Sequence, residues 1–164
     1  MKRWGSIVLA TCVLAVGCGD DNGTGPSTAP LVFTADLRPA NEVPPIGNAE
    51  GGGFGAVQIT IDQTAGTATF FYQLTGFPSG TRVQGAHIHS AGPGVNGPIV
   101  VDTRVTAASP LVISNPITEF SATGIPVTPA TLQAIINNPA AFYFNVHSPL
   151  NPGGFARGQL VRTQ

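Results

Sequence analysis

The sequence predicts an all-β domain with one short helix, and two observations support this fold class. Gly (21 residues) and Pro (15) are abundant and charged residues make up only 9%, which would indicate disorder if apolar residues were scarce. Apolar residues instead reach 42% of the chain and are rich in the strand-forming Val, Ile and Phe. Short alternating segments recur between glycine- and proline-rich turns, and about eight of them predict a β-sandwich or barrel.

The alternation of apolar and polar side chains is clearest at the start of this domain. Residues 31–37 and 55–62 alternate in this way, as strands with one buried face do. A turn at 63–66 separates the second segment from a strand at 67–75, so that residues 55–75 form a hairpin. The remaining strands are predicted at 83–89, 98–103, 111–120, 141–147 and 156–162.

One helix interrupts the strands near residue 130. Thr128 is a good N-cap and Pro129 suits the first helical position, while Asn137-Asn138-Pro139 stops the helix. We expect this helix to cover an open end of the sandwich. The apolar side chains that share one of its faces are Leu132, Ile135 and Ile136.

The N-terminal residues predict an export signal. Lys2 and Arg3 precede an apolar run over residues 7–16, which is too short to span a bilayer as a stable helix. The phrase Leu14-Ala15-Val16-Gly17-Cys18 is similar to the lipobox of bacterial lipoproteins. This similarity implies a lipoprotein signal peptide at 1–17 and a lipidated Cys18 at the mature N-terminus. Cleavage at Cys12 and an ordinary secretory cleavage are the alternatives.

Residues 18–30 predict a flexible tether between the lipid and the domain. They are small, polar and turn-prone, and they contain no periodic apolar pattern. The folded domain is then expected at 31–164. The protein would be exported to the cell envelope, with the membrane as one partner through its lipid anchor and an unknown protein or envelope component as another.

The charge balance argues against nucleic-acid binding. Lys and Arg number 7 and Asp and Glu number 8, so loss of Lys2 and Arg3 with the leader takes the formal charge from −1 to −3. Nucleic-acid-binding domains instead carry a basic patch. Catalysis has little support either, because Ser90 and Ser148 each follow a histidine directly, and adjacent strand residues point to opposite faces. We therefore expect a non-catalytic protein.

The three histidines of the chain form the sharpest candidate site. His87 and His89 are two apart on a predicted strand and therefore share a face, and His147 ends another strand. Both strands run into turns rich in Gly, Pro and Asn, which suggests that the histidines gather at one rim of the sandwich. Three neutral imidazoles could hold one Cu²⁺ or Zn²⁺ ion. Alternatively, they hydrogen-bond to the backbone and anchor the two turns.

Glu42 and Arg157 are isolated charges in turn-flanked motifs. Pro44 and Pro45 force an extended path after Glu42, and Arg157 lies between Ala156 and Gly158. An arginine among small residues often forms an ion pair or clamps loop carbonyls. Glu42 could pair with Arg157, act as a fourth metal ligand or remain a solvated surface residue.

Several separated motifs resemble the CHRD domain family, which takes its name from the chordin proteins and is widespread in exported bacterial proteins. The resemblance spans the whole predicted domain and implies a Greek-key β-sandwich, but no settled biochemical activity. The motifs that carry it are Phe33-Thr34-Ala35-Asp36-Leu37, Asn41-Glu42-Val43-Pro44-Pro45, Ala86-His87-Ile88-His89, Asn96-Gly97-Pro98-Ile99-Val100, Phe144-Asn145-Val146-His147-Ser148, Asn151-Pro152-Gly153-Gly154 and Arg157-Gly158-Gln159-Leu160.

A second likeness concerns the His-x-His phrase, which leads into a glycine-rich loop and looks like the copper-binding strand of the copper–zinc superoxide dismutases. A dinuclear site of that type needs more histidines than the three in this chain, so any metal would be mononuclear. The sequence thus predicts a structural or interaction module of the cell envelope, with a mononuclear copper or zinc protein as the alternative.

Overall fold

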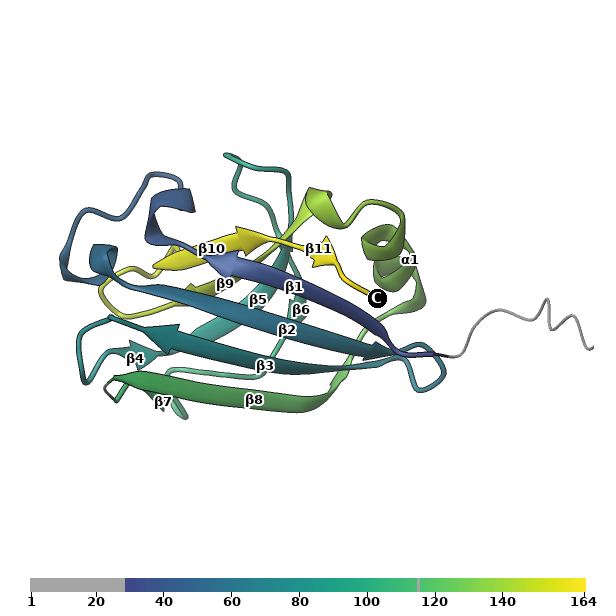
Figure 1. Cartoon of the computed structure of the whole chain (residues 1–164), viewed down its shortest axis with the longest axis horizontal. Coiled ribbons are helices and arrows are strands. Elements are labelled where there is room, and N and C mark those ends of the chain that lie inside the picture. Colours follow the sequence, from purple (N-terminus) through teal and green to yellow (C-terminus); the bar gives the residue numbers. More distant parts are fainter. Residues whose placement is uncertain (1–28, 115) are drawn as a thin grey trace, which may run out of the picture.

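The computed structural model describes residues 29–114 and 116–164, and its two main sheets form a β-sandwich (Figure 1). The predicted signal peptide, Cys12, Cys18 and most of the tether lie outside the described residues. The first sheet is antiparallel, with strands in the order β11 (Val161–Arg162), β1 (Leu31–Leu37), β2 (Phe54–Asp62), β3 (Thr67–Thr75) and β8 (Ile117–Pro126).

The second sheet packs against the first and carries most of the motifs named above. Its order is β10 (Ala156–Gln159), β9 (Phe142–His147), β5 (Gly85–Ser90) and β6 (Ile99–Asp102), and a separate pair joins β4 (Arg82–Val83) to β7 (Leu111–Val112). After β6 the chain crosses back, so that β8 pairs with β3, and β9 then returns to pair with β5. These crossings are Greek-key connections, and the predicted all-β sandwich is confirmed.

The core lies between the inner faces of the two sheets. Phe70 and Tyr72 of β3 contact Phe144 of β9, with ring centroids 5.7 Å and 5.4 Å apart, and all three side chains are fully buried. Because β3 and β9 belong to different sheets, these rings hold the two layers together. The period-2 alternation that predicted 31–37 and 55–75 is visible in the burial of β1, β2 and β3.

The predicted helix is present as α1 (Pro129–Asn137), and it lies at the end of the sandwich where the described chain begins and ends (Figure 1). The Thr128 hydroxyl accepts a hydrogen bond from the Thr131 N–H at 3.2 Å. Leu132 and Ile135 are buried, and Ile136 packs against the core. Three short 3-10 helices were not predicted: η1 (Pro39–Asn41), η2 (Ala49–Gly52) and η3 (Pro139–Ala141).

The prediction of one strand over 111–120 was wrong. The segment divides into β7 and the start of β8, which lie in different sheets. Between them, Ser114 donates its N–H to the Thr118 hydroxyl at 2.8 Å, and Pro116 has no N–H for a strand ladder. This turn therefore divides the segment that the apolar pattern predicted as a single strand.

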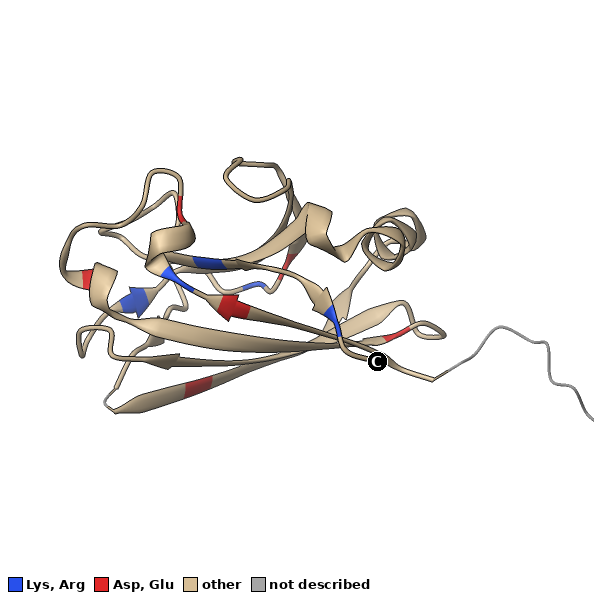
Figure 2. Ribbon diagram, turned by 45° about the horizontal axis from the view of Figure 1, so that its top comes forward, with Lys and Arg blue, Asp and Glu red and all other residues tan. Residues whose placement is uncertain are grey.

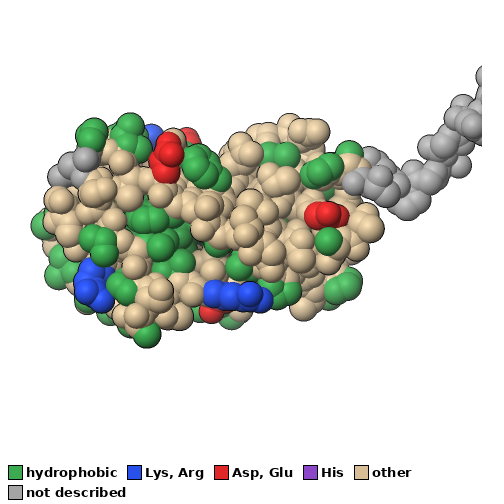
Figure 3. All heavy atoms as spheres, turned by 90° about the horizontal axis from the view of Figure 1, so that it is seen from below, with side chains coloured by type: hydrophobic (Ala, Val, Ile, Leu, Met, Phe, Trp, Pro, Cys, Tyr) green, Lys and Arg blue, Asp and Glu red, His purple; other side chains and the backbone are tan. Residues whose placement is uncertain are grey.

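Charged side chains are few and interspersed over the described residues, without a basic cluster (Figure 2). On the side of the molecule that carries β7 and β8, apolar side chains are visible between isolated charges (Figure 3). Val112 of β7 and Ile117 of β8 are 50% and 54% exposed. Among the described residues, no helix has the length and hydropathy needed to cross a bilayer.

Candidate metal centre

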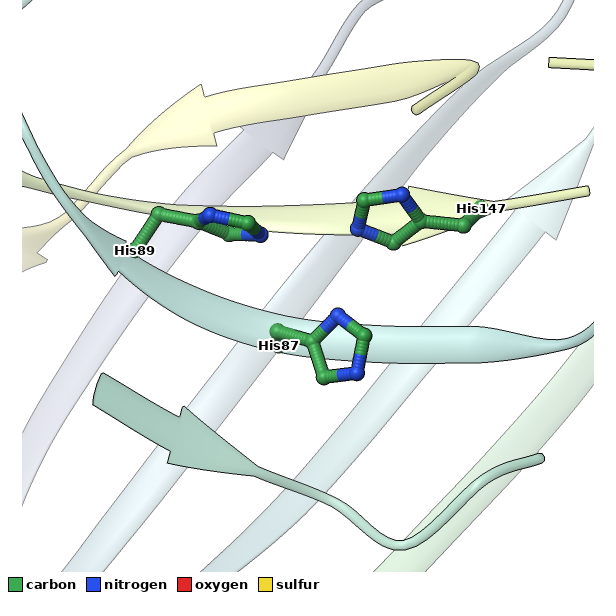
Figure 4. Close-up of side chains that lie close together, drawn as sticks. All are labelled: His87, His89 and His147. Atoms are coloured by element: carbon green, nitrogen blue, oxygen red, sulfur yellow. The ribbon is translucent and has the colours of Figure 1, made fainter. Parts of the chain in front are cut away.

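The pairing of β5 with β9 brings the three histidines together. In the antiparallel register His87 lies opposite Asn145, His89 opposite Tyr143 and Gly85 opposite His147. His87 and His89 share a face, and His147 is the diagonal neighbour of His87. The three side chains converge above the two strands (Figure 4). Ring centroids are 4.9 Å apart for His87 and His147, 5.6 Å for His89 and His147, and 5.8 Å for His87 and His89.

The cluster lies on the outer face of the second sheet, and not at the expected rim of the sandwich. The alternate residues Ala86, Ile88 and Val146 belong to the core, so the histidines must point away from it. They are nevertheless buried, because the connections after β5 and β9 fold over them. His89 and His147 are 7% and 9% exposed, and the His87 side chain is 13% exposed.

Two of the imidazoles are held by backbone carbonyl groups. The Nδ1 atom of His89 is 2.9 Å from the carbonyl oxygen of Gly97, and Nδ1 of His147 is 3.1 Å from that of Pro152. A carbonyl oxygen only accepts hydrogen bonds, so each Nδ1 carries the proton and donates it. Each Nε2 is then an unprotonated acceptor, and both Nε2 atoms are buried with no hydrogen-bond partner in the part of the chain that the structure describes.

His87 is turned the other way. Its Nε2 lies 3.7 Å from the Asp102 carboxylate on neighbouring β6, whereas its Nδ1 is buried and has no hydrogen-bond partner within residues 29–114 and 116–164. The cluster therefore combines Nδ1 of His87 with Nε2 of His89 and of His147. Outer carbonyl or carboxylate groups next to the second ring nitrogen are typical of histidines that bind metals, because they orient the ring and fix its tautomer.

The separation of these nitrogens suits one ion. The potential ligand atoms of the three histidines lie within 4.8 Å of one another, so all three lie well within about 4 Å of one common point. Metal–nitrogen bonds are about 2.0 to 2.1 Å long, a distance that small ring rotations can reach from this arrangement. The histidine group contains no carboxylate from the described part of the chain, so Glu42 is not a fourth member.

Burial keeps the three imidazoles neutral at pH 7. It lowers the pKa of all three side chains and takes that of His147 to about 4. The neighbouring histidines lower the pKa of His147 further, while its bond to Pro152 opposes the shift. Metals bind the neutral form. Protons should therefore compete with a metal at a lower pH than the ordinary histidine pKa of 6.5 would predict, most clearly at His147.

A glycine makes room for the cluster. Gly85 precedes His87 by two positions and faces the same side of β5, directly opposite His147. A Cβ atom at this position would lie 2.8 Å from Cε1 of His87 and 3.5 Å from the His147 side chain. Any larger residue at 85 would therefore displace the His87 ring from the group.

Glu50, which the sequence did not single out, fastens the loop beside His147. Its buried carboxylate accepts hydrogen bonds from the Ser148 hydroxyl (2.7 Å) and from the Asn151 amide. Asn48 and Asn151 also bond to each other through their side chains. Glu50 and Ser148 are 98 positions apart in the chain, so only the fold brings them together. Gly51, Gly52 and Gly53 follow Glu50 in the sequence, which indicates a bend but not a buried carboxylate.

We expect Glu50→Gln to lower the free energy of unfolding by about 1 to 3 kcal/mol, because glutamine keeps one acceptor oxygen but removes the carboxylate charge that strengthens both buried hydrogen bonds. Urea denaturation of the two proteins measures this difference. Glu119→Gln is the matched control, since Glu119 is exposed and accepts a solvent-exposed hydrogen bond from the Gln73 amide. An equal decrease in the free energy of unfolding for both variants would show that the buried Glu50 network stabilises the fold no more than an exposed hydrogen bond does.

The structure brings Glu42 and Arg157 together beside the histidine cluster. Arg157 Nε lies 3.8 Å from the Glu42 carboxylate, and both residues are buried. Arg157 also donates to the carbonyl oxygen of Asn41 (2.7 Å) and to the Asn96 side chain (2.8 Å), so it clamps two loops. Burial raises the pKa of Glu42 to about 7, and the guanidinium opposes that rise.

Tyr143 connects this ion pair to the histidines. Its ring stacks on His89 at 4.8 Å with 5° between the planes, and the Arg157 guanidinium lies 4.6 Å from its centroid. Its hydroxyl accepts a hydrogen bond from Gly97, whose carbonyl holds His89. The stack orients His89 on one side and the Arg157 clamp on the other.

The chain is therefore an all-β sandwich domain with a buried, loop-covered cluster of three histidines on the outer face of one sheet. The family model of the CHRD domain matches residues 33–160, and the chain belongs to this family. CHRD domains are non-enzymatic, which supports a non-catalytic module. A comparison with curated proteins found no match.

Proposed function

We propose that this CHRD domain is a non-catalytic module of the cell envelope that binds one transition-metal ion through His87, His89 and His147. The observation that carries the proposal is the trio of buried ring nitrogens that face one another and have no hydrogen-bond partner among the described residues. Buried polar atoms normally have partners, and the Nε2 atoms of His89 and His147 are both acceptors, which cannot satisfy each other. A cation at the centre of the trio would satisfy all three.

The surrounding groups support the same proposal. The carbonyls of Gly97 and Pro152 and the carboxylate of Asp102 lie next to the outer ring nitrogens. They would hold the rings in place and leave the inner nitrogens free as ligands. Copper or zinc fits imidazole donors, and three protein ligands leave a coordination position for water or for a group from a partner.

The test is calorimetry with Cu²⁺ and Zn²⁺ on protein purified without a histidine tag. We expect one ion per chain, with Cu²⁺ bound more tightly than Zn²⁺ as the usual order of divalent affinities requires. His89→Ala should weaken binding by at least about 100-fold, since loss of a ligand should exceed the effect of losing an outer partner. The control is Gln58→Ala, on the exposed face of the other sheet.

Two results would contradict the metal site. If the parent shows no saturable binding, or if His89→Ala binds as well as the parent, the histidines are backbone anchors for the two loops. In that case His89→Ala should still destabilise the fold, because Gly97 and Tyr143 lose their partner.

We further propose that the domain is tethered to a membrane through a lipid on Cys18. The support is in the sequence: Lys2 and Arg3, the apolar run at 7–16 and the lipobox-like phrase before Cys18. Such an anchor would hold the module at the envelope, where it would act as a structural or interaction domain.

Cys18→Ala should release the protein from membranes or leave it unprocessed, because the lipidated residue is lost. Membrane fractionation and gel migration of the parent and the variant measure both effects. Cys12→Ala is the matched control. If Cys12→Ala, and not Cys18→Ala, changes fractionation, the lipidated residue is Cys12.

A further inference from the structure

We infer that the three-histidine pocket selects a monovalent ion, copper(I), over the divalent ions zinc(II) and copper(II). This inference rests on the proposed metal site and names its occupant. It follows from the charge of the ligands, their burial, the charges around them and the number of donors.

The donor set carries no negative charge. Zinc and copper(II) sites often include a thiolate or carboxylate, which offsets part of the charge of the ion. Here the group holds three imidazoles and, among the described residues, no acidic member or cysteine. The charge of any bound ion would therefore remain almost entirely on the ion and its three neutral ligands.

Burial makes the presence of that charge energetically unfavourable. The three inward nitrogens are inaccessible to solvent, and His89 and His147 are more than nine-tenths buried. The free energy of moving an ion from water into a medium of low dielectric constant is unfavourable and rises with the square of the charge. The desolvation free energy of a dication is therefore about four times that of a monocation of similar size.

The fixed charges nearby do not offset a second positive charge. Arg157 is buried and lies behind Tyr143, which stacks directly on His89. The Glu42 carboxylate faces Arg157, and its single negative charge can at most neutralise the positive charge of that arginine. Asp102 is the acidic group next to the cluster, but its side chain is 58% exposed, so water and salt screen it.

The number of donors points in the same direction. Zinc(II) in proteins is almost always four-coordinate, with three protein ligands and a water at an open position. Copper(I) has the same filled d shell but is stable with two or three ligands. Three buried imidazoles from two adjacent strands can therefore complete a copper(I) site without a further ligand.

Competition titrations under anaerobic conditions test the selectivity. The protein is the full chain with Cys12→Ser and Cys18→Ser, so that no thiol binds copper(I). Bicinchoninate serves as the competitor for copper(I), and a chromophoric zinc chelator serves for zinc(II). Because both ions have filled d shells, the comparison isolates charge and coordination number. We expect copper(I) to bind at least about 100-fold more tightly than zinc(II), a difference of about 2.7 kcal/mol.

A charge-changing variant separates charge from fold. His87→Glu replaces the most exposed ligand with another donor and adds one negative charge to the pocket. We expect the preference for copper(I) over zinc(II) to fall at least about tenfold in this variant. Gln58→Glu adds the same charge to the exposed face of the other sheet and should leave the preference unchanged.

The outcomes distinguish the inference from the proposal beneath it. Binding of zinc(II) or copper(II) that equals or exceeds copper(I) binding, and that is lost in His89→Ala, overturns the selectivity and leaves the metal site intact. An unchanged preference in His87→Glu also overturns it. Absence of histidine-dependent binding by any of the three ions removes the metal site and the inference together.

Discussion

Replacement of Arg157 by methionine should lower the free energy of unfolding by about 3 to 5 kcal/mol, because it leaves the Glu42 carboxylate buried without its cation. It also removes the donors that bind Asn41 and Asn96. Methionine retains an unbranched apolar stem, so little of the loss should come from packing. Chemical denaturation at pH 8 measures the difference.

Two controls test this prediction: a variant of an exposed arginine and a double variant that removes both members of the ion pair. Arg162→Met changes an exposed arginine in β11 and should alter stability by less than about 1 kcal/mol. The double variant Arg157→Met with Glu42→Met should recover part of the loss, because no unpaired charge stays buried. A loss for Arg157→Met no larger than that for Arg162→Met would mean that the buried pair is energetically equivalent to a surface pair.

The metal-free protein should lose stability as the pH falls from about 6.5 to about 4, with the chelator EDTA present throughout. Burial lowers the pKa of His147 from 6.5 to about 4, so the unfolded chain binds a proton in this interval that the folded chain does not. The stabilisation is complete above pH 6.5 and is lost as the pH falls towards 4. For His147 alone it amounts to about 3 kcal/mol, and the lowered pKa values of His87 and His89 act in the same direction.

Glu42 opposes this trend. Its pKa is raised from 4.5 to about 7, so its contribution to stability is complete below pH 4.5 and is lost as the pH rises through 7. Urea unfolding at several pH values should therefore give a steeper acid loss in Glu42→Gln than in the parent, and a shallower one in His147→Gln. Parallel pH profiles for the parent and His147→Gln would contradict the assignment to His147.

The sequence predicted the sandwich well where one face of a strand is buried. Strands β1, β2 and β3 alternate in burial as their apolar pattern required, and the Thr128 cap and Asn137-Asn138-Pro139 gave the helix its limits. The split of 111–120 escaped prediction, because Ser114 and Thr118 form a turn through a contact that apolar periodicity does not encode.

The candidate site was predicted in membership but not in place. Spacing alone put His87 and His89 on one face, and the pairing of β5 with β9 added His147. Strand β9 is buried at all six positions, since loops cover its outer face. Inward and outward residues of β9 therefore look alike in the sequence, and the pattern could not predict that the histidines lie on the outer face of the sheet. Glu50 and Tyr143 were missed for a related reason, because their partners come from distant loops.

The pairing of β5 with β9 also determines when the site can exist. His89 and His147 are 58 positions apart in the chain, and strand pairing over such a separation forms slowly, because a long loop must close first. Before β5 and β9 pair, only His87 and His89 lie close together, because they are neighbours on one strand. The three-nitrogen pocket therefore forms only when the sandwich closes. A protein that folds after crossing a membrane would take up its ion on the far side, from whatever metal that compartment offers.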